Sequence, residues 1–288
     1  MAQSPTNPGE YISCLKVEGR GEADAFILIV TTNEERTLHV SRIFFYQNFP
    51  TQEGTIAVSL DTWLVDFTVA TDGTIISISA DGVVWSTRGG DPAQTKLSRD
   101  PLTKICGPLD SATIATVGFH GRAFRQDGDT WTDLNYPDDH NLYDVTALSN
   151  NDIYVCGAGG VFAHYDGVDW TQIDLPTNRN LHTVTHNADG RVVVAGNAGI
   201  IFVGSLAAGF EETSAEEVDI HGSCVYRGRF VLASPGYGCF ALDGTTVSEF
   251  QRGFEPFRIT ANGRHLLAAE DARVVLYDGS AWRVMDVF

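Results

Sequence analysis

The chain has 288 residues, of which 43% are hydrophobic and 19% are charged, a composition typical of an ordered globular protein. Its 37 aspartates and glutamates outnumber its 19 lysines and arginines, so the formal net charge is -18. Such a charge repels phosphate backbones and anionic membrane surfaces, and the basic residues are scattered singly along the chain. We therefore expect neither nucleic acid nor a membrane as a partner.

The amino terminus and the cysteines indicate the cellular compartment of the protein. Residues 1–10 lack the basic start and the apolar stretch of a secretory signal, so we expect them to form a mobile tail. No apolar run approaches the ~20 residues needed to cross a bilayer. The five cysteines are odd in number, widely spaced and without a C-x-x-C pair, which predicts neither disulfides nor a zinc site. These features favour the cytoplasm.

A repeat of nearly 40 residues dominates the rest of the chain. A small residue ends the second apolar run of each unit, with spacings of 39, 39, 39, 38 and 35 residues between successive markers. The markers are Ser79, Gly118, Gly157, Gly196, Ser234 and Ala269. Each unit has four short runs rich in Val, Ile, Phe, Tyr and Thr, bounded by Gly, Asp and Asn, which predicts antiparallel strands.

Two turn signals recur inside the repeat. The second and third runs meet at a small-x-x-Gly turn such as 157–160, where glycine adopts a positive φ at no steric cost. The third and fourth runs meet at Asp-Gly followed by an aromatic residue, as in 127–131, 166–170 and 278–282. The aspartate is expected to bond the turn backbone, and the tryptophan to pack between neighbouring sheets.

This pattern predicts an all-β fold, a seven-bladed β-propeller of four-stranded antiparallel blades in one domain that spans residues 11–288. The expected blades cover residues 11–60, 61–100, 101–140, 141–180, 181–217, 218–253 and 254–288. The first range lacks the Asp-Gly-x-x-Trp signal, so six blades plus an irregular amino-terminal segment is the alternative. The last range ends on an outermost strand, which predicts closure of the ring without a strand borrowed from the other terminus.

The repeat resembles a known group of propellers. The runs 157–162 and 166–171 are similar to the repeats of propellers with sialidase-like Asp-box blades, which include the photosystem II assembly factors. The resemblance covers blades 2 to 7 and implies the fold alone. The pattern Ser-x-Asp-x-Gly-x-x-Trp is met in part by Ser79–Trp85, where the glycine comes one place early. The arginine triad and the Tyr-Glu pair of sialidases find no place on these blades, so the resemblance does not imply their activity.

Candidate chemistry is sparse. No nucleotide-binding, nucleophile or metal motif is present, which predicts no catalytic residue, no cofactor and no obligatory metal. Residues 137–140 (Pro-Asp-Asp-His) offer two carboxylates and an imidazole, but a solvated connector between blades explains them better. His120, His140, His182 and His221 are expected at the same end of the ring, where satisfied or solvated imidazoles are favoured over a shared ligand site.

That end of the ring is the predicted binding surface. We expect acidic side chains at the entrance of the innermost strands and in the adjacent loops to form an acidic funnel, with aromatic rings among them. The predicted funnel residues are Asp66, Asp81, Asp138, Asp139, His140, Asp144, His182, Asp219, Glu270 and Asp271. The predicted aromatic anchors are Phe119, Tyr143 and Tyr237.

The sequence thus favours a non-enzymatic propeller that binds a basic protein or peptide through this acidic, loop-bearing face. Two roles stay open: an inhibitor that neutralises a basic toxin or nuclease, as immunity proteins do, and an assembly or scaffold factor. One alternative is a sialidase-like propeller that binds or cleaves a glycan at the central channel. Another is a subunit of an obligate complex, which would carry a broad apolar patch.

Overall fold

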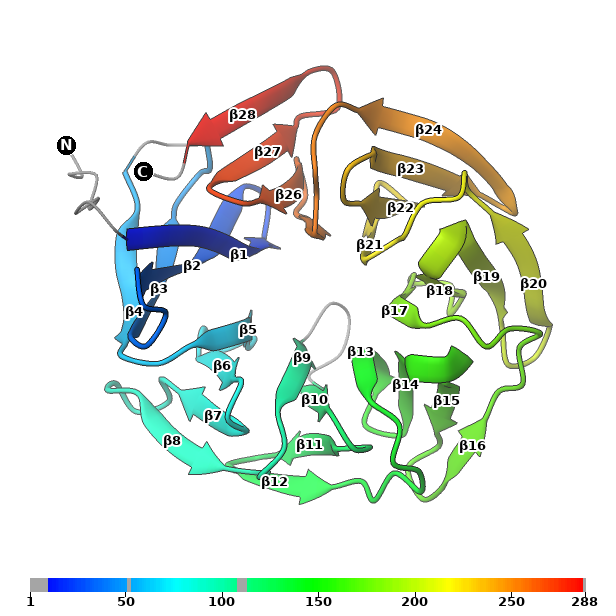
Figure 1. Cartoon of the computed structure of the whole chain (residues 1–288), viewed down its shortest axis with the longest axis horizontal. Helices are drawn as coiled ribbons and strands as arrows, with labels where there is room; N and C mark the ends of the chain where they lie inside the picture. The colour runs from blue at the N-terminus through cyan, green and yellow to red at the C-terminus, as the bar shows by residue number, and fades with distance from the viewer. Residues whose placement is uncertain (1–9, 51–52, 108–112, 287–288) are drawn as a thin grey trace.

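A computed structural model describes residues 10–50, 53–107 and 113–286, which form a ring of seven four-stranded antiparallel sheets (Figure 1). In every blade the four strands follow the chain order from the channel to the outside of the ring. This confirms the predicted all-β, seven-bladed propeller. The six-bladed alternative is wrong, because the residues up to 60 form a complete first blade with long, well-paired strands.

The strand bounds show how evenly the blades follow one another. The first three blades consist of β1 (Glu10–Arg20), β2 (Asp24–Asn33), β3 (His39–Tyr46), β4 (Thr55–Leu60), β5 (Leu64–Val69), β6 (Ile75–Ser79), β7 (Val83–Ser86), β8 (Ala93–Lys96), β9 (Leu102–Cys106), β10 (Ala115–Gly118), β11 (Ala123–Asp127) and β12 (Thr130–Asp133). Blades four and five consist of β13 (Leu142–Ser149), β14 (Asp152–Gly157), β15 (Phe162–Tyr165), β16 (Trp170–Gln172), β17 (Leu181–His186), β18 (Val192–Gly196), β19 (Ile200–Ser205) and β20 (Gly209–Ser214). Blades six and seven consist of β21 (Gly222–Tyr226), β22 (Arg229–Ser234), β23 (Gly238–Asp243), β24 (Thr246–Arg252), β25 (Arg258–Ala261), β26 (Leu266–Glu270), β27 (Arg273–Tyr277) and β28 (Trp282–Asp286).

The remaining structure is turns and connectors. Two short 3-10 turns, η1 (Ala158–Gly160) and η2 (Asn197–Gly199), lie between the second and third strands of their blades. In the part of the chain that the structure describes, no helix has the length and apolar character to cross a membrane. Each predicted blade range holds one sheet. Of the expected mobile tail, residues 1–9 lie outside the described residues and Glu10 already belongs to β1.

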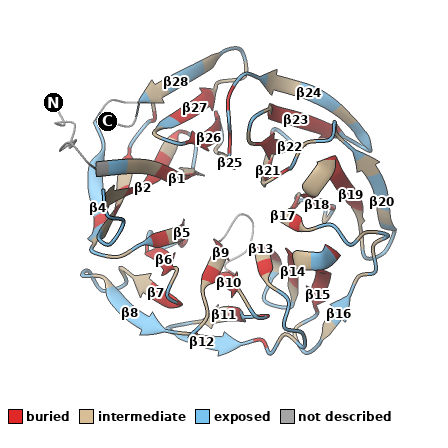
Figure 2. Cartoon of the chain, viewed as in Figure 1, coloured by how far each residue is buried: buried red, intermediate tan, exposed pale blue. Residues whose placement is uncertain are grey.

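The hydrophobic core is divided among the seven interfaces between neighbouring blades. The side chains of a strand alternate between the two faces of its sheet, so each blade contributes to two interfaces. In β14, Ile153 and Val155 pack with blade three, whereas Tyr154 and Cys156 pack with blade five. Burial accordingly decreases from the inner strands to the outermost strands, whose side chains are largely exposed (Figure 2).

The Asp-Gly-x-x-Trp turns at Asp166 and Asp278 have the predicted geometry, whereas the Asp127 carboxylate instead binds the side chains of Arg125 and Thr132. The Asp166 carboxylate accepts hydrogen bonds from the backbone N–H groups of Val168 and Asp169, at 2.9 and 2.8 Å. The turn delivers Trp170 to the interface with blade three, where its indole N–H donates to the carbonyl of Leu134 at 2.9 Å. The tryptophan therefore connects two blades, as expected from the repeat.

The small-x-x-Gly turns bring the blade connectors against the sheets. Gly160 has a φ of 81°, and a Cβ there would lie 2.4 Å from the carbonyl oxygen of Thr177. Gly121 is equivalent: its φ is 66° and a Cβ would lie 2.0 Å from the carbonyl oxygen of Asp138. Only glycine permits this approach. The glycine thus lets the connector that leads to the next blade lie directly on the turn.

The ring closes by packing, without a shared strand, as the sequence predicted. Every blade is built from four consecutive strands. Cys14, Ile27 and Ile29 of the first blade share one buried cluster with Leu267 and Leu276 of the last. The backbone N–H of residue 14 also donates to the carbonyl of residue 271.

Candidate functional site

The fold gives the ring two different ends. Because neighbouring strands run antiparallel, the blade connectors and the turns between second and third strands lie at one end, which we call the connector face. The other turns lie at the opposite end, the hairpin face. Six predicted site residues lie in loops of the connector face and are exposed there: Asp81, Asp138, Asp139, His140, Asp219 and Asp271. The structure thus places these six side chains on one face of the ring.

Local pairing fixes several of these exposed side chains. The Nδ1 atom of His140 lies 2.8 Å from Asp138, and that of His120 lies 3.1 Å from Asp139. Asp219 accepts a hydrogen bond from the backbone N–H of Ala198 at 2.8 Å. Across the described ranges, no three side chains of His, Cys, Asp and Glu gather in a group able to hold a metal ion.

Asp66 and Asp144 lie elsewhere than predicted. Both are buried, so they cannot contact a partner at the funnel surface. Each carboxylate accepts the backbone N–H of the next residue in its own strand and one from the innermost strand of the next blade. For Asp66 the second donor is Ile105, at 3.1 Å, and for Asp144 it is Val184, at 3.0 Å. These two aspartates join adjacent blades.

Two lysines balance the buried aspartates. Lys16 Nζ lies 2.8 Å from Asp66, and Lys104 Nζ lies 3.7 Å from Asp66 and 4.0 Å from Asp144. The charges therefore alternate around the channel wall across blades one to four. Burial would raise the pKa of Asp66, but the charges of Lys16, Lys104 and Arg258 lower it to about 2. We call Lys16, Asp66, Lys104 and Asp144 the charge belt.

A bulge recurs at the belt residues in the innermost strands. The pairing of the innermost strand with the second strand shifts between Cys14 and Lys16 in blade one and between Leu64 and Asp66 in blade two. In blade three it shifts between Val117 and Gly118 of β10, which pair with Lys104 and Leu102. A bulge changes which face a side chain occupies. The sequence shows no bulge marker, which explains why these carboxylates were expected at an open surface.

Glu270 and Tyr237 also differ from the prediction. Glu270 is buried, accepts the backbone N–H of Glu255 at 2.7 Å and pairs with Arg273 at 3.0 Å. Its carboxylate therefore holds the last connector instead of facing a partner. The Tyr237 ring stacks on Phe240 with centroids 4.8 Å apart, and its other side is covered by Arg252, 4.3 Å from the ring centroid.

Aromatic rings form an arc at the connector-face mouth of the channel. The rings of Tyr143 and His182 are stacked with centroids 5.4 Å apart, and those of His182 and His221 with centroids 4.5 Å apart. Phe257 follows at 6.4 Å from His221 and is exposed. Burial and the neighbouring His182 both lower the pKa of His221. Two predicted residues, Tyr143 and His182, thus belong to a four-blade aromatic arc, whereas Phe119 lies half-buried in the β10–β11 turn.

The connector face also contains a cleft that the sequence did not predict. The Trp63 cleft has a volume of about 560 Å³ between the first two blades and is lined by Leu38, His39, Asp61, Trp63 and Asp81, among others. The Trp63 side chain is 47% exposed and that of Leu38 is 69% exposed. The available signal was that Trp63 stands in a blade connector, outside the Asp-Gly-x-x-Trp pattern.

The backbone around the cleft is held by both blades. Ser41 of the first blade donates its hydroxyl to the carbonyl of Thr62 at 2.6 Å, and the backbone N–H of Ala80 donates to the carbonyl of Trp63 at 3.3 Å. The imidazole of His39 lies against the indole, with centroids 4.8 Å apart. These contacts fix the exposed indole beside the carboxylates of Asp61 and Asp81.

The central channel is the second unexpected feature. Its cavity of about 480 Å³ extends from the charge belt to the turns of the hairpin face, and cations from three blades line it. These are Lys16, Arg20, Lys104 and Arg258. The basic residues are scattered singly along the sequence, as predicted, but the ring brings these four together in one cavity, whose lining also includes Glu18, Asp144 and Asp189.

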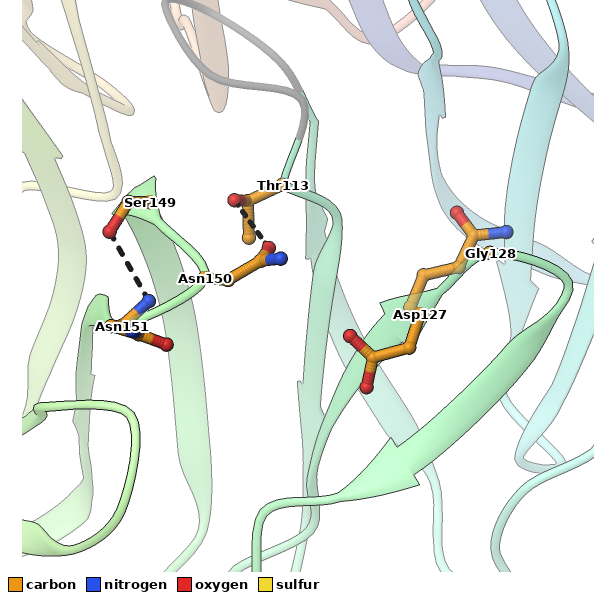
Figure 3. A pocket seen from close by; sticks show the side chains of 7 residues that line it. Thr113, Asp127, Gly128, Ser149, Asn150 and Asn151 are labelled. Carbon is orange, nitrogen blue, oxygen red and sulfur yellow. Dashed lines mark hydrogen bonds between the residues drawn. The ribbon is translucent and has the colours of Figure 1, made fainter.

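A third pocket lies on the hairpin face between blades three and four (Figure 3). Its volume is about 650 Å³, and its polar groups bond one another. The Thr113 hydroxyl donates to the Asn150 amide oxygen at 2.8 Å, and Asp127 pairs with Arg125 at 3.0 Å. Because these groups are already satisfied, this pocket offers less for recognition than the other two.

Comparisons with known proteins support the fold. The sequence matches no known protein family and no curated protein. Among solved structures, a virginiamycin B lyase from Staphylococcus aureus superposes with a TM-score of 0.69 at 14% identity, over 92% of this chain and 93% of that chain. The WD40 β-propeller domain of Doa1 gives 0.69 at 8% identity, over 92% and 95% of the two chains. YCF48 bound to a D1 peptide gives 0.60 at 12% identity, over 77% and 80%. At these identities the similarity establishes the propeller fold, and it agrees with the resemblance to photosystem II assembly factors.

Proposed function

We propose that the protein is a non-enzymatic propeller that binds a basic protein or peptide on its connector face. The observation that carries this proposal is the Trp63 cleft, whose lining combines an exposed tryptophan and an exposed leucine with two exposed aspartates, Asp61 and Asp81. An acidic surface alone would attract many cations. The cleft adds a shaped apolar contact that can select one of them.

An arginine or lysine side chain matches the chemistry of this cleft. Its aliphatic stem would pack on Leu38 and the Trp63 ring, and its charged end would reach the Asp61 and Asp81 carboxylates. A cation over an indole face is stabilised by the ring quadrupole. Tryptophan is also among the residues that most often dominate binding energy at protein interfaces.

The other exposed carboxylates would act at longer range. Asp138, Asp139, Asp219 and Asp271 are spread around the same face, so a basic partner would be attracted to this end of the ring before it makes contact. Such steering mainly raises the association rate and weakens as salt is added. The partly exposed aromatic arc at the channel mouth extends the surface toward the centre.

Two roles agree with this mode of binding. One is inhibition of a basic toxin or nuclease, and the other is an assembly or scaffold function. A propeller of this fold, YCF48, has been solved with a bound peptide, which supports the capacity of such a ring to hold a peptide segment. The free state of all five cysteines supports a cytoplasmic site of action.

The proposal is tested by selecting ligands from a displayed library of short random peptides. We expect the enriched peptides to contain arginine or lysine beside an apolar residue. We expect Trp63→Ala to lower their affinity about tenfold or more, measured by calorimetry. The double variant Asp61→Asn/Asp81→Asn should lower it as well, with a smaller dependence on salt than the parent protein shows.

Matched controls on the hairpin face separate the cleft from the global charge. Asp129→Asn/Asp169→Asn changes the net charge by the same amount as the cleft double variant, and Val168→Ala removes another exposed apolar side chain. All three positions lie in turns between third and fourth strands. Equal losses of affinity in the cleft and control variants, or enrichment of acidic peptides, would contradict the proposal.

A further inference from the structure

We propose that the central channel binds a small anion with at least two negative charges, a phosphate or a di- or tricarboxylate, between Lys104 and Arg258. This site is separate from the proposed protein-binding surface. The lining of its cavity continues to residues 187–189 of the β17–β18 turn and to Gly228, which belong to the hairpin face.

The first part of the argument is that the carboxylates near the belt already have close donors. Asp66 receives Lys16 at 2.8 Å and two backbone N–H groups, at 2.9 and 3.1 Å. Asp144 receives two backbone N–H groups, at 2.9 and 3.0 Å. Glu18 pairs with Lys16 at 3.2 Å and accepts the N–H of Val69 at 3.0 Å. Little of their negative charge is left for further cations.

The second part is that two cations lack a close acceptor. Lys104 Nζ lies 3.7 and 4.0 Å from the nearest carboxylate oxygens, longer than a hydrogen bond. Arg258 forms no ion pair and no side-chain hydrogen bond with any residue that the structure describes. Both side chains line the same cavity. Burial and the charge of Arg258 lower the pKa of Lys104, and the charges of Asp66 and Asp144 only partly oppose them.

The cavity suits a small ligand. Its volume of about 480 Å³ lies within the range of roughly 300–1,000 Å³ that is usual for small-molecule sites. Hydroxyl groups form part of the wall, where Thr183 Oγ1 lies 2.7 Å from Ser223 Oγ. A dianion would accept hydrogen bonds from both Lys104 and Arg258, and it would also accept hydrogen bonds from such hydroxyls. Asp189, at the outer end of the lining, disfavours large polyanions that would extend to the mouth.

This inference is tested by calorimetric titration of the full chain at one low ionic strength. The ligands are sodium pyrophosphate, inorganic phosphate and succinate. We expect one ligand per chain. Binding of the phosphates alone would assign phosphate chemistry to the site, and binding of succinate would assign carboxylate chemistry. We expect Arg258→Met and Lys104→Met each to weaken binding about tenfold or more. Arg264→Met is the matched control, because that side chain is 63% exposed on the hairpin face, outside the cavity lining.

Arg258→Met also distinguishes binding from a structural role. Arg258 has no ion-pair partner, and its removal takes a favourable charge from Asp66 but an unfavourable one from Lys104, so the variant without ligand should unfold at about the same temperature as the parent protein. The inference is overturned if none of the three anions binds, if Arg258→Met leaves the affinity unchanged, or if Arg264→Met weakens binding equally. Trp63→Ala should retain anion binding, so failure of the protein-binding proposal would not affect this result.

Discussion

The exposed loops of the connector face, which we call the rim, and the charge belt both contain aspartates, but the environments of these aspartates are opposite. The Asp139 side chain at the rim is 84% exposed and has one imidazole partner. The Asp66 side chain in the belt is 1% exposed and is surrounded by two lysines and two backbone donors. An aspartate at the rim is therefore accessible to a partner, whereas an aspartate in the belt is buried and already bonded within the fold.

The cations differ between the two regions as well. An acidic chain with a net charge of -18 places four cations along its channel, where seven innermost strands meet. The rim carries exposed carboxylates instead, together with exposed arginines such as Arg99, Arg122 and Arg179. The net charge of the chain therefore does not predict the local charge of the channel, whose lining contains both cations and carboxylates.

The largest expected effect comes from removing a belt aspartate. Asp66→Ala leaves two buried backbone N–H groups without their acceptor and takes the nearest carboxylate from Lys16, so we expect the free energy of unfolding to fall by about 3–5 kcal/mol. Asp139→Ala at the rim should change it by about 0.5 kcal/mol or less. Urea unfolding of both variants measures the difference, and similar losses would contradict the division between belt and rim.

A smaller effect is expected from acid. The pKa of Asp66 is about 2 in the folded state, below its usual value near 3.9 in unfolded chains. Its stabilisation is therefore complete above about pH 4 and is lost as the pH falls through about 2. The stability gap between the parent protein and Asp66→Asn should shrink by about 2 kcal/mol between about pH 5 and about pH 2.

Urea titrations across this range measure the gap, because the other titrating carboxylates are common to both proteins. The expected sign follows from the lowered pKa: the parent protein loses stability as Asp66 gains its proton, and the asparagine variant has no such proton to gain. A gap that stays constant would mean that the pKa of Asp66 is not lowered in the fold.

The smallest expected effect concerns the aromatic arc. The pKa of His221 is lowered by burial and by the adjacent His182. His182→Phe keeps a ring for stacking but removes the charge, so the pKa of His221 should rise. His182→Ala should raise it further, because solvent would reach the imidazole. Histidine chemical shifts followed by NMR as a function of pH measure both values, and an unchanged pKa in His182→Phe would show that burial alone sets it.

Much of the fold follows from local sequence signals. The spacing of the small residues, the Asp-Gly-x-x-Trp turns and the glycines of the second-to-third strand turns predict six units of four strands, and the structure adds the amino-terminal blade as the seventh. Each signal reflects a local requirement, such as the positive φ of Gly160 or the turn-capping carboxylate of Asp166. The connector face was predictable for the same reason, because strand direction alone decides which loops share an end.

The binding features were less accessible to sequence reasoning. Trp63 and Leu38 come from two different blades, and neither belongs to the repeat pattern. Asp66 and Asp144 occupy equivalent positions, as predicted, but a bulge at each position and the lysines of neighbouring blades decide that they are buried. A periodicity argument identifies equivalent positions without determining their environment.

The sequence by itself determined the all-β repeat, the strand order within a blade and which loops share an end of the ring, because these depend on contacts within about 40 residues of chain. Only the tertiary structure decided which charges remain free. Lys16, Lys104 and Arg258 are far apart in the sequence, and they meet because ring closure brings the first, third and seventh innermost strands around one channel. Electrostatic environment depends on distance in space, so the belt and the shared cavity of Lys104 and Arg258 exist only once the ring has closed.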